Sequence, residues 1–136
     1  MPISSEGMYR CFLVLEILRS TGLKEFPMQL ASMFFYIASH NGCLQQDLEE
    51  HCSQSNSAVS RNVDWLGALN RRGEPGLGWV RREKDHIDSK RWRVWLTPKG
   101  EQFCRVIQLQ LKGSPKPDKA HFPNYTDPYE KDQDLG

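Results

Sequence analysis

The sequence predicts a mainly α-helical protein with one small β-hairpin, an α+β fold class. Between residues 6 and 112, five segments repeat their apolar residues at helical spacing. One stretch, residues 78–97, instead alternates apolar and polar residues on either side of a polar tip, as two paired strands do. At 136 residues, the chain is long enough for one domain of ordinary size.

Residues 6–20 predict a first helix that is apolar on more than one face. Its main stripe at helical spacing consists of Met8, Cys11, Phe12, Leu15 and Leu18. Further apolar residues widen this surface, so the helix must be covered on several sides. The rest of the chain or a second copy of the protein can provide that cover, and the sequence leaves both open. Residues 1–22 are therefore a candidate dimerisation segment.

Two more helices are predicted at residues 26–40 and 44–52, on either side of the turn signal Asn41-Gly42. Pro27 suits the first turn of the earlier helix. The predicted inner face of that helix consists of Leu30, Phe34, Ile37 and Ala38. Leu48 is the predicted core anchor of the short helix that follows.

The segment 55–66, SNSAVSRNVDWL, predicts a fourth helix with small polar residues at its N-terminal end. Ser55 is a good N-cap, and Val59, Val63 and Leu66 define the buried side. A short helix, a tight turn and a second helix of this kind are typical of a helix-turn-helix. There the second helix enters the DNA major groove, where small side chains allow close approach and Arg61 can donate two hydrogen bonds to guanine.

The two strands predicted within residues 78–97 form a basic hairpin after the helix-turn-helix. We expect Trp92, Val94 and Leu96 to face the core. The alternate residues, expected to face solvent or DNA, are Arg91, Arg93 and Trp95. A basic hairpin in this position is the wing of a winged helix-turn-helix, and its tip can contact a neighbouring groove or the DNA backbone.

A last helix is predicted at residues 97–112, with Thr97 as N-cap and Pro98 at the first helical position. Its apolar stripe consists of Phe103, Ile107 and Leu111. We therefore assign residues 23–112 to one winged helix-turn-helix domain. Residues 113–136 are rich in proline and charge, with few aliphatic residues, and predict a disordered tail.

Charge is nearly balanced overall, with 18 basic and 17 acidic side chains, but it is unevenly distributed. Residues 55–105 contain eleven basic and six acidic groups, whereas residues 1–54 contain three and six. A basic middle segment is what a nucleic-acid surface needs in a protein that is not basic overall. An ordinary solvated charged surface explains the same pattern.

These features together resemble the MarR family of bacterial winged-helix regulators, over roughly residues 26–103. Leu48 stands at the family's usual leucine, and Asp88 at the aspartate of its D-x-R wing motif. Leu96-Thr97 and Gly100 match its L-T-x-x-G ending. The chain departs from the family at Lys90, which replaces the D-x-R arginine and lacks its planar fork. The loop at residues 67–77 is also longer than usual.

The resemblance implies a homodimer built from the N- and C-terminal helices. It also implies a small aromatic effector bound between the dimerisation and DNA-binding parts. Candidate lining residues are Phe12, Phe34, Phe35 and Tyr36. The alternative for these aromatic residues is an ordinary place in the core.

Other chemistry has little support in the sequence. There is no G-x-S-x-G, phosphate loop or H-E-x-x-H motif, so no enzyme and no cofactor are predicted. His40, Cys43, His51 and Cys52 lie close in sequence, but His51 and Cys52 are adjacent and point in different directions on a helix, so we expect no metal site. No apolar run approaches the ~20 residues of a membrane span. The expected location is the cytoplasm, with reduced thiols.

The predicted function is sequence-specific binding of double-stranded DNA, as a homodimeric transcriptional regulator. The predicted DNA contacts are Gln45, Gln46, Ser55, Asn56, Ser57, Ser60, Arg61, Lys84, Lys90, Arg91 and Arg93. Two alternatives stay open. One is a winged-helix protein-interaction adaptor that uses an exposed Trp95 together with the aromatic residues of the tail. The other is the DNA-binding component of a phage or plasmid replication or control system.

Overall fold

The structure is a computed structural model that describes residues 5–23, 25–69 and 72–112. Within these ranges it contains five helices and a three-stranded sheet. The elements in chain order are α1 (Ser5–Arg19), α2 (Met28–Ser39), β1 (Cys43–Leu44), α3 (Gln45–His51), α4 (Asn56–Leu66), β2 (Val80–Lys84), β3 (Trp92–Leu96) and α5 (Pro98–Lys112). Each predicted helix is present, with ends that differ from the prediction by at most two residues at α2.

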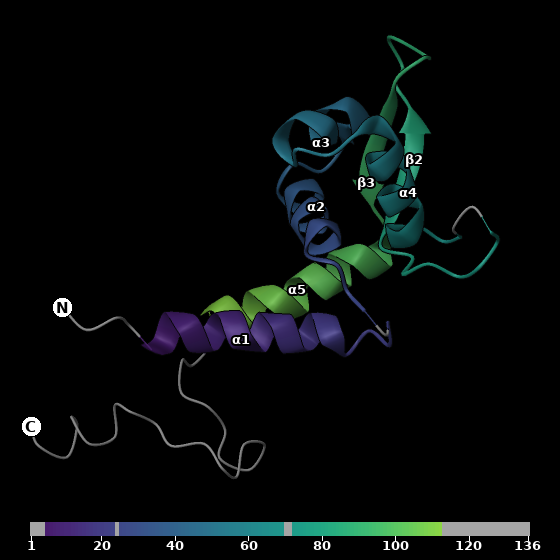
Figure 1. Cartoon of the computed structure of the whole chain (residues 1–136). Helices are drawn as coiled ribbons and strands as arrows, with labels where there is room; N and C mark the ends of the chain where they lie inside the picture. The colour runs from purple at the N-terminus through teal and green to yellow at the C-terminus, as the bar shows by residue number, and fades with distance from the viewer. Residues whose placement is uncertain (1–4, 24, 70–71, 113–136) are drawn as a thin grey trace, which may run out of the picture.

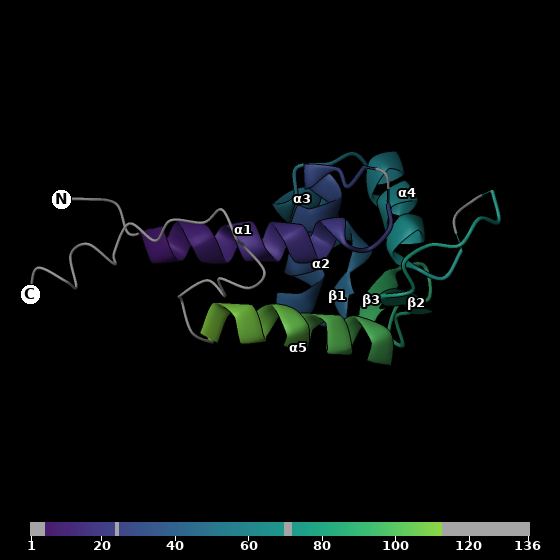
Figure 2. The same ribbon diagram turned by 90° about the horizontal axis from the view of Figure 1, so that it is seen from below.

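The helices form two parts that share one core (Figure 1). α1 and α5 lie side by side along one edge of the molecule. α2, α3, α4 and the sheet stand on that pair, with the β2–β3 hairpin extending beyond α3 and α4. Seen from below, α1 and α5 run across the base of the domain (Figure 2). The outer end of the hairpin is therefore remote from the two terminal helices.

Helix starts follow the capping residues of the sequence. The Ser55 side chain accepts a hydrogen bond from the backbone N–H of Ala58 (3.2 Å), which confirms Ser55 as the N-cap of α4. The Thr97 hydroxyl accepts one from the N–H of Gly100 (3.1 Å) at the start of α5. Pro27 is the N-cap of α2 rather than a first-turn residue, so that helix begins at Met28.

The sheet has the order β1-β3-β2, and both pairings are antiparallel. Val94, fully buried in the middle of β3, lies between Cys43 of β1 and Arg82 of β2. β1 is only two residues long and was not predicted. No alternating pattern marks so short a strand, and its pairing partner is some fifty residues away in the sequence.

The core joins both parts of the molecule through aromatic rings. The ring of Trp79, just before β2, lies 4.8 Å from that of Phe34 on α2 and 4.0 Å from that of Phe103 on α5, measured between centroids. α5 approaches this tryptophan closely, because a Cβ added at Gly100 would overlap the Trp79 carbonyl oxygen. The glycine of the L-T-x-x-G ending thus lets α5 pack directly on the backbone before the wing.

Most of the predicted core residues are buried. They include Leu30, Phe34, Ile37, Leu48, Val59, Val63, Leu66, Val94 and Ile107. The prediction was wrong for Trp92, whose exposed fraction is 41%, because β3 at this point has passed the end of the helices that cover Val94. It was also wrong for Leu111, 46% exposed near the end of α5.

The predicted stripe on α1 is mostly uncovered. Leu18 is buried, but Met8, Phe12 and Leu15 are 60%, 41% and 57% exposed, and Cys11 is exposed as well. The rest of the chain, as far as the structure describes it, therefore covers only part of this apolar helix.

The predicted disordered tail, residues 113–136, lies outside the described residues. Across the described ranges, no helix combines the length and the apolar character needed to cross a membrane.

Candidate nucleic-acid interface

The N-terminal end of α4 is an exposed polar surface. Ser55, Asn56, Ser57 and Arg61 all have exposed side chains. The preceding turn contains Ser53 with a φ of 51°, a left-handed conformation that lets the chain reverse within a few residues of the end of α3. The turn therefore brings α4 across α3 with its first residues facing outward.

Ser60, a predicted base contact, faces inward instead. Its carbonyl oxygen accepts a hydrogen bond from Arg82 Nη2 (2.7 Å), and its hydroxyl lies 3.3 Å from the same nitrogen. Asn62 of the same helix is also engaged, because its amide donates to the Gln54 Oε1 (2.8 Å), and Gln54 in turn donates to the Gln29 carbonyl of α2 (3.2 Å).

Arg82 on β2 is the centre of a network that sequence reasoning missed. Its Nη1 lies 2.6 Å from the Asp64 Oδ1, and its Nε donates to the Gln45 Oε1 (3.0 Å). With the bonds to Ser60, one guanidinium thus joins α3, α4 and the wing. Both members of the Arg82–Asp64 ion pair are largely buried, with side chains 26% and 14% exposed. The only signal for this network in the sequence was the presence of an acidic residue, Asp64, and a basic residue, Arg82, at inward-facing positions.

The two predicted glutamines differ in their surroundings. Gln45 is half-buried and bonded to Arg82, so its side chain holds the wing rather than facing outward. Gln46, the next residue of α3, is exposed. Of the pair, only Gln46 has an exposed side chain.

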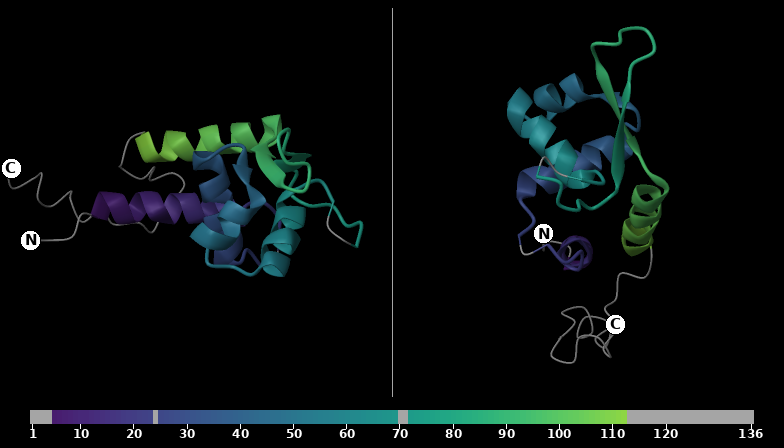
Figure 3. Two further views of the ribbon diagram at one scale, coloured as in Figure 1. Left: turned by 90° about the horizontal axis from the view of Figure 1, so that it is seen from above. Right: turned by 90° about the vertical axis from the view of Figure 1, so that its right-hand side faces the viewer.

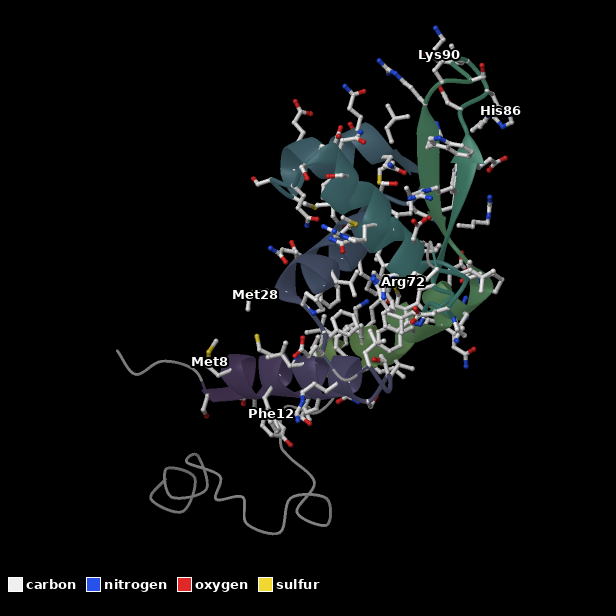
Figure 4. The ribbon with its side chains drawn as sticks, turned by 45° about the vertical axis from the view of Figure 1, so that its right-hand side comes forward. Met8, Phe12, Met28, Arg72, His86 and Lys90 are labelled. Atoms are coloured by element: carbon white, nitrogen blue, oxygen red, sulfur yellow. The ribbon has the colours of Figure 1, made fainter. Side chains whose placement is uncertain are left out.

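The wing has exposed cations at its outer end. Lys84, Lys90 and Arg91 are exposed, and Lys84 Nζ lies 5.5 Å from the ring centroid of Trp92. Arg91 Nε lies 3.6 Å from the Asp88 Oδ2. We call residues 85–91, between the two strands, the wing tip; Figure 4 shows Lys90 and His86 at this tip, far from the terminal helices.

Arg93 and Trp95, predicted to face solvent or DNA, pack against the protein. Arg93 Nε donates to the Asp85 Oδ1 (2.8 Å), and its Nη1 donates to the Gly42 carbonyl (2.8 Å). The Arg93 guanidinium holds the pKa of the Asp85 carboxyl below its usual value. The ring of Trp95 lies on Gly42, where an added Cβ would come within 2.6 Å of it. Both predictions failed because Gly42, just before the neighbouring strand β1, provides a carbonyl acceptor for Arg93 and room for the ring of Trp95.

The wing tip and the N-terminal end of α4 lie on the same side of the molecule. In Figure 1 both are at the top, and the turned view in Figure 3 shows α3 and α4 on one flank of the hairpin with its tip projecting past them. The exposed polar helix end and the exposed cations therefore form one candidate interface on that side, with α1 and α5 at the opposite end.

An open cavity of about 590 Å³ lies between α2 and α5, within the size range of small-molecule sites. Its lining includes Phe35, Leu96, Ile107, Ser39, Arg105 and Gln108. Of the four aromatic residues proposed for an effector pocket, only Phe35 is among the lining residues. Phe34 is fully buried in the core, and Tyr36 is stacked between the rings of His40 and His51.

Metal and redox chemistry find little support within the described ranges. No group of three histidine, cysteine or acidic side chains there could hold a metal ion. Burial raises the pKa of the Cys43 thiol to about 11 and also raises the pKa of Cys52 and Cys104. Thiols with raised pKa values react slowly because the thiolate is the nucleophile.

No protein-family model matches the sequence, and no curated protein matches it. Solved structures, however, do share the fold. A MarR transcriptional regulator from Methanosarcina mazei Go1 superposes with a TM-score of 0.57 at 16% identity, over 98% of this chain and 86% of that one. A MarR-like regulator from Thermotoga maritima gives 0.54 at 22% identity, over 98% and 89%.

A mutant of MarR from E. coli, solved in complex with operator DNA, gives a TM-score of 0.57 at 18% identity, over 96% of this chain and 84% of that one. In these superpositions the likeness spans nearly the whole chain, terminal helices included. The chain therefore has the MarR-like winged helix-turn-helix fold, with α3 and α4 as the helix-turn-helix and the β2–β3 hairpin as the wing.

Proposed function

We propose that the chain is a sequence-specific double-stranded DNA-binding protein that regulates transcription as a homodimer. The observation that supports it most is the shared orientation of two surfaces, the small polar N-terminal end of α4 and the basic wing tip. The fold is that of regulators solved with DNA, such as MarR from E. coli with its operator.

In this proposal α4 enters the major groove. Ser55, Asn56, Ser57 and Arg61 contact base edges or nearby phosphates, because they are the exposed residues of its first turns. Gln46 contacts the backbone. Ser60, Gln45 and Arg93 serve the interface indirectly, since their hydrogen bonds hold α4 and the wing in place.

The wing supplies contacts that do not depend on sequence. Lys84, Lys90 and Arg91 are exposed cations spaced around its outer end, suited to phosphates or to the minor groove. The adaptor alternative loses its main support, because Trp95 is packed on Gly42 rather than exposed.

The test compares Arg61→Ala with Lys90→Ala on duplexes selected from a random pool. Loss of a bidentate arginine contact should cost about 1–3 kcal/mol of binding free energy and relax the preference at one base pair. Loss of Lys90 should weaken binding to all sequences alike and reduce the slope of log K against log salt by about 1. Binding that neither substitution alters would place the DNA site, if there is one, elsewhere.

The homodimer is proposed from the uncovered face of α1. Met8, Phe12 and Leu15 are apolar and exposed at i, i+4 and i+7, so they form one strip on a helix. α5, which lies beside α1, adds Leu109, 69% exposed. A second copy packing here would leave both α4 helices and both wings free for DNA.

We also propose that the cavity between α2 and α5 binds a small aromatic effector. Its apolar lining and its few polar groups, among them Arg105, Glu101 and Gln108, suit a small ring with one polar substituent. Such a ligand should raise the melting temperature of the protein. Leu111→Trp, at an exposed lining position, should fill part of the cavity and reduce that response.

A further inference from the structure

The wing tip is held in one conformation by its two aspartates. The Asp85 carboxylate accepts hydrogen bonds from Arg93 Nε (2.8 Å) and from the backbone N–H of Asp88 (3.2 Å). The Asp88 carboxylate accepts one from the N–H of Lys90 (3.0 Å). The backbone N–H of Asp85 donates a hydrogen bond to the Arg91 carbonyl (2.9 Å), which closes the loop. This loop is therefore braced, and its remaining side chains project in fixed directions.

Ile87 is the apolar side chain that this bracing presents to solvent. With an exposed fraction of 95%, it is the most exposed large apolar residue in the described part of the chain. Isoleucine is β-branched and stiff, so the side chain keeps its direction when it meets a surface. A braced loop with an isoleucine at its outer end has the form of a wedge.

Exposed cations lie near this apolar tip. They are Lys84 and Lys90, together with Arg91, whose guanidinium is paired with Asp88 (3.6 Å). The acidic residues of the loop are both engaged, Asp85 by Arg93 and Asp88 by the Lys90 N–H and the Arg91 guanidinium. An apolar point among cations fits a partner with a hydrophobic interior between two rows of negative charge.

Duplex DNA is that partner: its phosphates flank the grooves and its stacked bases are apolar on their faces. Proteins that bend DNA through the minor groove insert isoleucine, leucine, methionine or phenylalanine between base steps. The wing tip lies on the same side as the N-terminal end of α4, so it would meet the groove next to the one that α4 enters (Figure 3).

We propose that Ile87 is a wedge that enters the minor groove, partly unstacks one base step and kinks the bound duplex. This inference rests on the proposed DNA binding and adds a mode of indirect readout. Flexible pyrimidine–purine steps cost least to kink, so the protein would prefer such a step beneath the wing tip without any hydrogen bond to its bases.

The experiment uses the full chain and a duplex selected by it from a random pool. Fluorophores at the two DNA ends report bending by energy transfer, and 2-aminopurine placed through the flank of the site reports unstacking. The variants are Ile87→Ser and Ile87→Leu. Met28→Ser is the matched control, because Met28 is 86% exposed on α2, away from the wing (Figure 4).

Wild-type protein should shorten the end-to-end distance and brighten 2-aminopurine at one flanking step. Ile87→Ser should lose both signals and bind about tenfold more weakly, a loss of about 1.4 kcal/mol, with an unchanged salt slope because no cation is removed. Ile87→Leu should retain both signals, as should Met28→Ser.

Two results would overturn the wedge while leaving the proposed function intact. One is tight, sequence-specific binding by the wild type without bending or unstacking. The other is an Ile87→Ser protein that bends DNA as the wild type does. A wild-type chain that binds no duplex at all would instead overturn both the wedge and the proposed function.

Discussion

Arg82 shows how one side chain can fix the relation between a recognition helix and a wing. Its guanidinium contacts Asp64 and Ser60 on α4 and Gln45 on α3 while its backbone is part of β2. Arginine suits this position because its planar fork can donate in several directions at once. The side chains of Arg82 and Asp64 are largely shielded from water, so removing one of them leaves a poorly solvated charge and lowers the free energy of unfolding.

Arg82→Ala should lower the free energy of unfolding by about 2 kcal/mol, measured by urea denaturation. Arg81→Ala is the control. Arg81 is the neighbour on the opposite face of β2, and it makes a solvent-exposed ion pair with Glu83 and a cation–π contact with Trp95 (5.8 Å), so the change should be within about 1 kcal/mol. The double variant Arg82→Ala/Asp64→Ala should cost less than the sum of the two single changes. Additive losses would mean that the two residues are not coupled.

Single residues were predictable from the sequence where their role is local. Ser55 and Thr97 cap their helices as expected, because a cap acts within three residues of itself. Arg93 and Ser60 were assigned to the DNA surface, but they bond to residues far along the chain, Gly42 and Arg82. Alternation along a strand indicates a face, but it cannot show which distant residues bond to the side chains on that face.

Among the elements, α1 is a helix whose apolar stripe the rest of the described chain covers only in part. Helical spacing correctly predicted an apolar helix, and the structure shows which part of it stays exposed. Elements defined by long-range pairing were harder to predict: β1 has two residues and no periodic signal, and β3 extends past its helical cover at Trp92. The pairing of β1 and the exposure of Trp92 both depend on where other elements end, which the local sequence does not show.

Leu15→Glu tests the proposed role of α1. A charge in the middle of the exposed strip should separate the subunits, because an unpaired buried carboxylate opposes association. Sedimentation equilibrium should give about twice 15.8 kDa for the wild type and 15.8 kDa for the variant. Met28→Glu, at an exposed apolar position on α2, should remain dimeric. A monomeric wild type at micromolar concentration would contradict the homodimer.

For the whole molecule, the division into a terminal-helix pair and a winged domain explains why the fold was predictable in outline. The spacing of apolar residues is helical in five segments and alternating in the hairpin, so it marks each element. The order of these elements along the chain then allows few ways of packing them around one core. The exact interface was less predictable. Several polar residues near it are internal supports, and the exposed isoleucine at the wing tip has no sequence signature of its own.

A dimer joined through α1 and α5 would present two copies of α4 related by a two-fold axis. Two-fold symmetric readers bind inverted repeats with half-sites about one helical turn of DNA apart. If α4 reads duplex DNA in such a dimer, which is the central claim, the bound DNA should contain an inverted repeat with this spacing.

Selection of duplexes from a random pool by the full chain tests that claim most directly. The account predicts enrichment of one inverted repeat whose half-sites are separated by about 10 base pairs, and loss of that enrichment when Arg61 is replaced by alanine. A pool that shows no enriched sequence after repeated rounds, or that is enriched equally by wild type and Arg61→Ala, would contradict it.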